Sequence, residues 1–447
     1  MADSDPDFDA GRGANPAAHV EAHREELVDL ALDLLAVDTT NPPGRTGEAV
    51  ALLESVLDVP GVETERVTAD PAKPNLLARL PGASDRTLLY NGHLDTVPFE
   101  ADRWSRDPRG ERADGRVYGR GATDMKGAVA AMALAVRAFV ETGTEPPADL
   151  LVALVSDEEV GGDAGLPALL EAGRLKADGC VIGEPTCAGD RHSVTIADRG
   201  SIWLTVEATG EAAHGSRPVL GENAIDRLYE AVRTIRERFG TRELSVDPAM
   251  EPVLAESVAY YAPSMGEANA RDLFRYPSVN LGTIEGGGAI NTVPESARAQ
   301  LDIRLTAGVE TRDVLSDIRA CVADCEGVTI ADVSWSVGTA EPVDNPLVEA
   351  VASTAAAVTG DRVYRCSATG GGDAKTLRNA GVPTVEFALG TDTAHAVDEY
   401  TTVDALVGNA TAYARLPFAW ADAVARERDG AVVGAEGGTA PDHEDTD

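Results

Sequence analysis

The chain has 447 residues, and its 75 Asp and Glu residues outnumber its 38 Lys and Arg residues, which gives a formal net charge of −37. This balance argues against a nucleic-acid partner, because a polyanion requires a basic surface and no run of Lys or Arg supplies one. It argues against an anionic membrane surface for the same reason. The length corresponds to about two or three domains, and an apolar content of 43% indicates a globular protein.

The acidic residues are spread over the whole chain, and only four of the basic residues are lysines. An acidic composition with so little lysine is typical of proteins from salt-loving organisms, in which concentrated cations screen the repulsion between acidic side chains. We therefore interpret the composition as halophilic. An acidic protein encoded by a GC-rich genome is the alternative.

The five cysteines form no CxxC motif, and their odd number fits no complete disulfide framework. A reducing compartment is the simplest explanation. The first residues are acidic and lack the apolar core of a signal peptide, and the longest apolar stretch, 127–136, is too short to span a bilayer. We expect a cytoplasmic protein without a membrane partner.

The two ends of the chain, residues 1–18 and 428–447, are rich in Gly, Pro, Ala and Asp and are predicted to be disordered. Between them, short apolar runs alternate with helical patterns. This alternation predicts an α/β fold with a mixed, mostly parallel sheet. The expected strands cover 87–90, 150–155, 180–182 and 384–389, and the expected helices include 21–36 and 126–140.

The segment 194–337 has a different order of elements and is predicted to be an inserted domain. Its pattern spells βαββαβ, which is the ferredoxin-like plan, with a proline-containing insertion at 244–277. The catalytic domain is then expected in two parts, 19–193 and 338–427. The expected elements of the insert are strands at 201–208, 279–285, 297–304 and 328–337 and helices at 222–238 and 309–323.

Residue types that bind metals follow the predicted strands of the larger domain. They are His93 and Asp95 after the first strand, Asp157, Glu158 and Glu159 after the second, Glu184 after the third and His395 after the fourth, with Asp124 in a glycine-rich loop before a helix. Ligands of an open parallel sheet bind beyond the carboxyl ends of its strands. One such residue alone would be an ordinary solvated side chain, but their convergence on one sheet edge predicts a metal site.

The chemistry of these residues favours two divalent cations such as Zn²⁺. Imidazole and carboxylate groups are zinc ligands, and a carboxylate can bridge a pair of ions. Without cations, so many acids in one pocket would repel each other. Glu158 and Glu159 are adjacent, so their side chains point to opposite sides of an extended strand end. One of them is therefore expected to be a ligand and the other a base.

Five motifs together resemble the M20 metallopeptidase family, which includes acetylornithine deacetylase, succinyl-diaminopimelate desuccinylase, aminoacylase and glutamate carboxypeptidase. The resemblance covers about residues 20–425 in the family's order, and it implies a di-zinc aminopeptidase-like catalytic domain interrupted by a ferredoxin-like lid and dimerisation domain. The motifs are Gly-His-Leu-Asp-Thr-Val-Pro at 92–98, Gly-Arg-Gly-Ala-Thr-Asp-Met-Lys-Gly at 119–127, Asp-Glu-Glu at 157–159, Gly-Glu-Pro-Thr at 183–186 and the late His395.

The resemblance implies specific roles for these residues. One zinc ion would be held by His93, Asp124 and Glu184, and the other by Asp124, Glu159 and His395, with Co²⁺ as a possible substitute. Glu158 would be the general base that takes a proton from the attacking water and returns it to the leaving amine. Asp95 would orient His93 through the second ring nitrogen, and the peptide bond between Asp124 and Met125 would be cis.

Three residues of the predicted inserted domain also match family positions. His214, in the sequence Ala-His-Gly-Ser-Arg-Pro, would stabilise the oxyanion from the partner subunit of a homodimer; outside this motif it would be a surface histidine. Arg304 would bind a substrate carboxylate, although an arginine at a strand end can also be a solvated charge. Asn291 would lie near the oxyanion. Gly370-Gly371-Gly372-Asp373 lacks the threonine of the corresponding family motif and so offers no threonine hydroxyl for a contact there.

We therefore expect a zinc-dependent amidohydrolase that removes an acyl group from an N-acyl amino acid. Glu184 at a position where the aminopeptidase branch carries Asp favours the deacylase and carboxypeptidase branches. A dipeptidase or carboxypeptidase that acts on short peptides is the enzymatic alternative, and an inactive binding protein on the same fold is the other. A dinucleotide fingerprint and a Gly-x-Ser-x-Gly nucleophile motif are both missing from the sequence.

Overall fold

The computed structural model describes residues 15–187 and 190–436 of the chain. The described residues divide into two compact units, the first made of those up to 194, 343–363 and those from 380 onward, and the second of residues 195–342 and 364–379. The chain passes between the units within strands β8 (His192–Ala197) and β13 (Val363–Ser367). In contrast to the predicted boundaries, segment 364–379, which includes α11 (Asp373–Asn379), belongs to the second unit.

The first unit is built around an eight-stranded mixed sheet of order β1-β2-β6-β3-β7-β14-β8-β13, whose last two strands, β8 and β13, continue into the second unit. Strand β3 pairs in parallel with β6 and β7, and β7 with β14, whereas β1–β2 and β2–β6 are antiparallel. This confirms the predicted α/β class. The remaining strands are β1 (Glu63–Val67), β2 (Asn75–Leu80), β3 (Thr87–His93), β6 (Asp149–Val155), β7 (Gly179–Ile182) and β14 (Thr384–Glu386).

Helix α4 (Lys126–Thr142) forms the centre of the helical layer of this unit. Its alanine-rich sequence is buried along almost its whole length, and the helix packs on β3 and β6 and against α12. It ends at Gly143, whose left-handed conformation is a common helix terminator. The other helices are α1 (Pro16–Ala22), α2 (Arg24–Ala36), η1 (Ala101–Arg103), α3 (Gly47–Leu57), α5 (Leu166–Glu171), α10 (Pro346–Thr359) and α12 (Val403–Glu436).

A small three-stranded sheet accompanies the main one, in the order β15-β5-β4. Strand β5 precedes the loop that carries Asp124, and β15 follows the loop that carries His395. The antiparallel pairing of β5 with β15 therefore brings these two distant loops side by side. The strands are β4 (Glu111–Ala113), β5 (Arg116–Tyr118) and β15 (Tyr400–Thr402).

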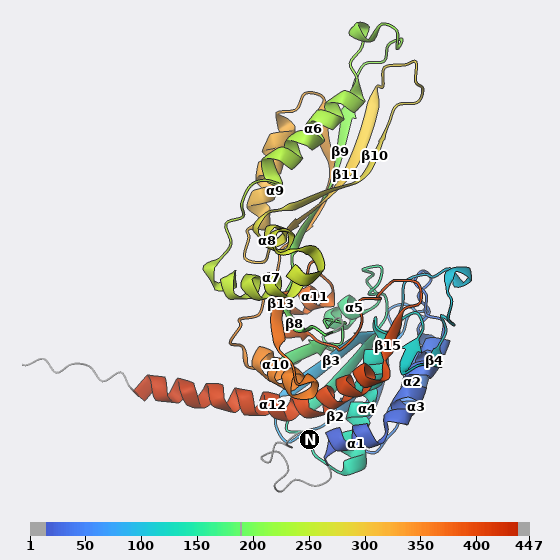
Figure 1. Ribbon diagram of the computed structural model, residues 1–447, viewed down its shortest axis with the longest axis vertical. Helices are drawn as coiled ribbons and strands as arrows, with labels where there is room; N and C mark the ends of the chain where they lie inside the picture. The colour runs from blue at the N-terminus through green and yellow to red at the C-terminus, as the bar shows by residue number, and fades with distance from the viewer. Residues whose placement is uncertain (1–14, 188–189, 437–447) are drawn as a thin grey trace, which may run out of the picture. The chain divides into compact units, whose positions relative to one another are not determined.

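The second unit contains the predicted βαββαβ arrangement. Its antiparallel sheet has the order β10-β11-β9-β12, which is the ferredoxin-like order, and α6 and α9 cover one face (Figure 1). The predicted insertion at 244–277 is helical. The elements are β9 (Gly200–Thr209), η2 (Pro218–Leu220), α6 (Ala224–Phe239), η3 (Pro248–Met250), α7 (Glu251–Met265), α8 (Glu267–Arg275), β10 (Ser278–Gly286), β11 (Ser296–Leu305), α9 (Thr311–Ala323) and β12 (Val328–Ser336).

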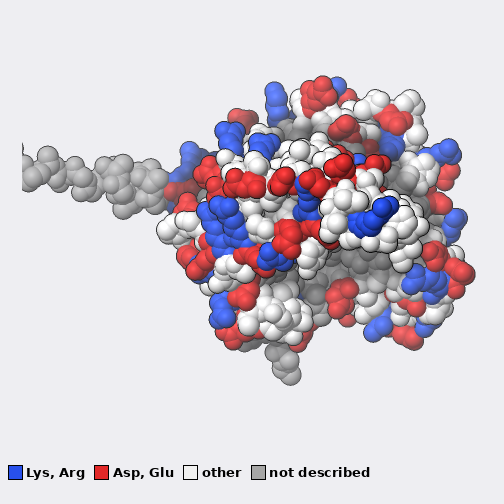
Figure 2. Space-filling model, turned by 90° about the horizontal axis from the view of Figure 1, so that it is seen from above, with Lys and Arg blue, Asp and Glu red and all other residues white. Residues whose placement is uncertain are grey.

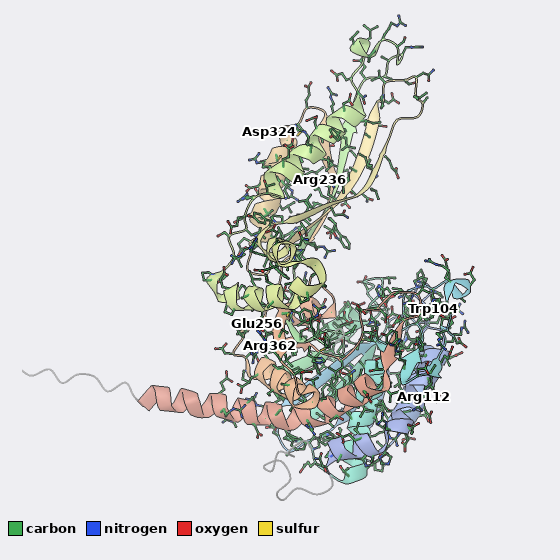
Figure 3. The ribbon with its side chains drawn as sticks, in the orientation of Figure 1. Trp104, Arg112, Arg236, Glu256, Asp324 and Arg362 are labelled. Atoms are coloured by element: carbon green, nitrogen blue, oxygen red, sulfur yellow. The ribbon has the colours of Figure 1, made fainter. Side chains whose placement is uncertain are left out.

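Amphipathic helices build the core of this second unit. Leu228 and Ile235 of α6 and Ile318 of α9 are fully buried against the sheet. Charged residues occupy the opposite side of the helices, where Arg236 on α6 and Asp324 directly after α9 are exposed (Figure 3). The helical spacing of apolar residues therefore accounts for both helices.

The predicted disordered ends are partly helical. Residues 16–18 belong to α1, whose first turn is capped by Asn15 and started by Pro16. Residues 428–436 continue α12. The rest of the predicted ends, 1–14 and 437–447, lies outside the described residues. Among the helices that the structure describes, none is both long and apolar enough to cross a bilayer.

Truncation of Ile318 tests the packing of the second unit. Because this side chain is fully buried, Ile318→Ala is expected to lower the free energy of unfolding by about 2–5 kcal/mol through lost apolar contact and a residual cavity. Urea denaturation followed by circular dichroism measures the change. The control is Ile284→Ala at a half-exposed position of β10, where a change within about 0.5 kcal/mol is expected. Equal effects of the two substitutions would contradict this description of the core.

Candidate metal centre

Three of the candidate ligands follow adjacent strands of the main sheet. His93 is the last residue of β3, and Glu159 and Glu184 lie in the loops after β6 and β7. In the parallel register His93 is level with Val155 at the end of β6, and Asn91 is level with Ile182 at the end of β7. The register therefore places the three loops at the same sheet edge, as parallel pairing requires.

Asp124 lies at the centre of the cluster, and its two carboxylate oxygens face two different histidines. Its Oδ1 is 3.1 Å from His93 Nε2, and its Oδ2 is 3.3 Å from His395 Nε2. Glu184 Oε1 lies 3.5 Å from the same nitrogen of His93, and Glu159 Oε2 lies 3.2 Å from that of His395. The geometry thus groups the five residues into two sets of three that share Asp124.

Electrostatics favours positive charge at this centre. Burial acts to lower the pKa of His93, but the hydrogen bond with Asp124 and the charge of Glu184 outweigh burial and raise it well above its usual value. Hydrogen bonds with Asp124 and Glu159 raise the pKa of His395 to about 10. Burial and the charge of Asp124 raise the pKa of Glu184. Positive charge therefore stabilises this group of carboxylates, and a divalent ion would bring more positive charge than a proton.

The donor atoms fit a metal. Ligand atoms of His93, Asp124 and Glu159 lie within 4.8 Å of one another. Glu159 Oε1 is buried, and among the described residues no hydrogen-bond partner reaches it. A buried carboxylate oxygen without a partner is costly, and coordination of a cation would satisfy it. Imidazole nitrogen and carboxylate oxygen together suit zinc.

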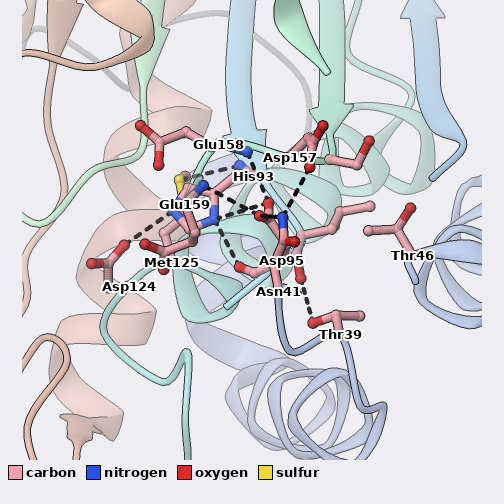
Figure 4. Close-up of polar contacts among 12 residues, drawn as sticks. Thr39, Asn41, Thr46, His93, Asp95, Asp124, Met125, Asp157, Glu158 and Glu159 are labelled. Atoms are coloured by element: carbon pink, nitrogen blue, oxygen red, sulfur yellow. Dashed lines mark hydrogen bonds and ion pairs between the residues drawn. The ribbon is translucent and has the colours of Figure 1, made fainter. Parts of the chain in front are cut away.

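Asp95 contacts the second ring nitrogen of His93 and also the loop that carries Glu158 and Glu159. His93 Nδ1 bonds to the backbone carbonyl of Asp95 at 2.9 Å, whereas the Asp95 carboxylate is 3.8 Å away from this nitrogen. The carboxylate instead accepts hydrogen bonds from the backbone N–H groups of Glu158 and Glu159, each at 3.2 Å (Figure 4). The side chain of Asp95 therefore fixes the loop that carries the two glutamates, and its main chain orients His93.

A buried network supports Asp95, and no sequence pattern indicated a functional role for two of its members, Asn41 and Lys73. Asn41 Nδ2 donates to Asp95 Oδ2 at 2.8 Å and to Asp157 Oδ1 at 3.0 Å, and Lys73 forms an ion pair with Asp157 (Figure 4). Asp157 has a φ of 69°, which is unusual for a residue other than glycine. These contacts hold the turn directly before Glu158. In the sequence, Asn41 begins an Asn-Pro-Pro-Gly segment after the helix predicted at 21–36, a pattern that indicates a chain turn and no functional role.

Glu158 lies beside the cluster and is half-buried. Burial raises the pKa of its carboxyl group, although the positive charge of His93 opposes this shift. A carboxylate with a raised pKa accepts a proton more readily, which suits a general base. The peptide bond between Asp124 and Met125 is cis, as the resemblance implied.

The structure places the remaining predicted residues in the second unit. His214 and Asn291 lie in neighbouring loops, because Gly215 N–H donates to the Asn291 carbonyl at 2.7 Å. His214 Nδ1 is 2.8 Å from Ser216 Oγ and accepts from the backbone N–H of Ser216. Arg304 is separate from them. Its Nε donates to Asp302 at 2.7 Å, and its guanidinium lies beside the ring of Trp203.

Comparisons with known proteins identify the family of this chain. Residues 89–418 match the family described as Peptidase family M20/M25/M40. Succinyl-diaminopimelate desuccinylase 2 of Ruegeria sp. (strain TM1040) is 31% identical over 411 residues, which cover 88% of this chain and 95% of that protein. Succinyl-diaminopimelate desuccinylase of Paracoccus denitrificans (strain Pd 1222) is 32% identical over 381 residues, covering 83% of this chain and 92% of that protein.

Solved structures share the fold at lower identity. The M20 family metallo-carboxypeptidase Sso-CP2 from Sulfolobus solfataricus superposes with a TM-score of 0.73 at 19% identity and covers 88% of this chain and 99% of that chain. Human carnosine dipeptidase 1 superposes with a TM-score of 0.67 at 20% identity, and the superposition covers 91% of this chain and 99% of that chain. The family match covers most of the chain, and the two desuccinylases are more than 30% identical to it. The chain therefore belongs to peptidase family M20/M25/M40 and is a hydrolase of amide bonds.

Proposed function

We propose that this enzyme removes an acyl group from an N-acyl amino acid, with an N-succinyl amino acid of the diaminopimelate type as its first candidate substrate. The single observation that carries the reaction type is the Asp124 carboxylate, whose two oxygens face two histidines that each have a further carboxylate partner. The substrate assignment is supported by the two desuccinylases, which align over more than four fifths of the chain.

The proposed cofactor is a pair of zinc ions. His93, Asp124 and Glu184 would hold one ion and Asp124, Glu159 and His395 the other. Such ions polarise a carbonyl group and lower the pKa of water. Asp124, Glu159 and Glu184 bring negative charge that two cations neutralise, and Glu159 Oε1 offers a buried donor atom.

Among the residues of the protein, Glu158 has the central role in the proposed reaction. Its carboxylate accepts the proton of the attacking water and then delivers it to the departing amine. Asp95 positions Glu158 by accepting its backbone N–H, so the base approaches the cluster from a fixed loop. The half-buried setting and raised pKa of Glu158 support this role.

Residues of the second unit are proposed to contact the substrate in a homodimer. His214 would stabilise the oxyanion from the partner subunit, with Asn291 beside it; their adjacent loops support a joint role. Arg304 would bind a substrate carboxylate. Asp302 and Trp203 support this assignment because they restrict the orientation of the guanidinium group.

Glu158→Gln tests the general base. The amide cannot take up a proton, so kcat is expected to fall by about 10²–10⁴-fold, whereas the zinc content should equal that of the unchanged enzyme. Steady-state kinetics and elemental analysis measure the two quantities. Glu100→Gln, at an exposed glutamate, is the matched control and should change neither. A kcat of Glu158→Gln within about threefold of the starting enzyme would remove Glu158 from the mechanism.

Metal removal tests the cofactor. Dialysis against a chelator should abolish hydrolysis, because the carboxylates would then lack the ions that activate water. Addition of Zn²⁺ or Co²⁺ should restore activity, with full recovery at two equivalents per chain. Activity that persists after elemental analysis shows complete removal would contradict metal dependence, and full recovery with a single equivalent would contradict a pair of ions.

A substrate panel tests the acyl group. N-succinyl-diaminopimelate is expected to be hydrolysed with a kcat/KM at least about tenfold above that of N-acetyl-ornithine or unmodified dipeptides, a difference of about 1.4 kcal/mol in transition-state binding. Amine release measures each reaction. Preference for a dipeptide would instead identify a dipeptidase within the same family.

A further inference from the structure

A buried ion pair links the two metal-ligand loops that lie outside the main sheet. Glu399 is fully buried and Arg120 is 5% exposed, and Arg120 Nη1 donates to Glu399 Oε2 at 2.5 Å. Neither residue was singled out from the sequence, and neither belongs to the proposed ligand sets. A buried pair of this kind is costly to desolvate unless further hydrogen bonds satisfy both groups. Among the described residues no partner reaches Arg120 Nε, but the partners of its two terminal nitrogens and of both Glu399 oxygens show what the pair holds.

The second oxygen of Glu399 holds the Asp124 loop. Oε1 accepts hydrogen bonds from the backbone N–H groups of Gly121, Thr123 and Asp124, at 3.1, 3.1 and 3.2 Å. One carboxylate oxygen therefore gathers three amides of this loop, including the amide of the ligand itself. Gly121 has a φ of 93°, and a Cβ there would lie 2.9 Å from Thr96, so the tight curve requires glycine.

The guanidinium of Arg120 holds the His395 loop. Its Nη2 donates to the backbone carbonyls of His395 and Ala396, at 3.2 and 3.1 Å. His395 has a φ of 62°, a conformation that residues other than glycine adopt at a cost of about 1–3 kcal/mol unless their surroundings impose it. Trp104, labelled in Figure 3, lies with its ring 5.3 Å from the guanidinium carbon. Arg120 thus stabilises the turn that presents the histidine.

Strand pairing brings these loops together but does not by itself align the ligands. Tyr118 of β5 pairs with Tyr400 of β15, and Gly119 N–H donates to the Glu399 carbonyl at 2.9 Å. After Tyr118 and before Tyr400, the two segments are no longer part of the small sheet. The Arg120–Glu399 pair continues the connection over the residues that carry Asp124 and His395.

We propose that Arg120 and Glu399 are positioning residues that set the spacing and orientation of Asp124 relative to His395, and thereby control the affinity for the cation held by Asp124, Glu159 and His395. This inference rests on the proposed two-ion site. Residues that orient metal ligands typically change metal affinity by about 10–100-fold when they are replaced. Variants that alter the pair should therefore weaken zinc binding most at the site that includes His395, because both loops of that site depend on the pair.

Zinc titration against a chromophoric chelator tests the proposal. The starting enzyme should bind two zinc ions per chain. Glu399→Gln removes the charge that pairs with Arg120, and Arg120→Lys removes the planar fork that reaches three acceptors. Each should weaken the site that includes His395 by about 10–100-fold and affect the other site less, because that site shares only Asp124 with the loops that the pair holds. In the Co²⁺-loaded protein, the absorption spectrum of the weakened site should change as well.

Asp149→Asn is the matched control for general destabilisation. Asp149 is also buried, pairs with Arg79 and accepts from Gly82 N–H, but it lies at the start of β6, at the opposite end of the strand from the ligand loop. This variant should lower the melting temperature and leave both zinc affinities unchanged. Arg120→Lys provides the measurement if Glu399→Gln fails to fold.

The outcomes separate the inference from the proposed function. If the starting enzyme binds two zinc ions and both pair variants bind them within about twofold of it, or if Asp149→Asn weakens zinc binding equally, the positioning role is wrong while the two-ion site stands. If the starting enzyme binds fewer than two ions, the proposed site fails, and the inference fails with it.

Discussion

The mutual repulsion of acidic groups is the constraint on which the functional half of this structure depends. Asp95, Asp124, Glu158, Glu159 and Glu184 are gathered around one end of three strands, in surroundings that are largely shielded from water. Such a cluster is unfavourable unless positive charge and hydrogen-bond donors compensate it. The two histidines contribute to that compensation, and their pKa values are raised as a consequence. A site of this kind therefore favours divalent cations.

Backbone N–H groups provide the second part of the compensation. The carboxylate of Asp95 takes up two amides of the glutamate loop, and the carboxylate of Glu399 takes up three amides of the Asp124 loop. Asp95 and Glu399 are not themselves proposed ligands, but each of these buried acids fixes a loop that carries a proposed ligand. Each acid also has a cationic or amide partner, Asn41 for Asp95 and Arg120 for Glu399. The acids of the site thus form two layers, an inner one of proposed metal ligands and an outer one that holds the loops.

Local sequence patterns predicted the strands and helices that position the site, and the order of residues after the strands predicted which side chains converge. Hydrophobic periodicity reveals strands and helices because each element must bury one face, which fixes the spacing of its apolar residues. The contacts of Asp95 and the roles of Asn41, Arg120 and Glu399 could not be predicted in this way. Arg120 and Glu399 are 279 residues apart, and their pairing arises from the β5–β15 connection, whose three-residue strands carry almost no pattern of their own. The helical insertion at 251–275 was obscured by its prolines, which stand at a first turn or near a helix end.

The surface shows that the acidic composition and the acidic site have different causes. Asp and Glu side chains are spread over the face seen in Figure 2, interspersed with basic side chains, and many basic residues form exposed ion pairs, such as Arg233 with Glu230 and Glu237. The few acids of the metal centre cannot account for a net charge of −37.

The two kinds of ligand loop also explain where the outer layer is needed. His93, Glu159 and Glu184 follow three adjacent strands whose parallel register already brings their loops to one edge. Asp124 and His395 follow no such strand directly, since β14 ends at Glu386 and Asp124 comes after the small sheet. Backbone register cannot align these two, so side chains must do so. Arg120 and Glu399 lie between these two loops. The loop of Asp124, whose two oxygens face two histidines, receives the largest number of their hydrogen bonds.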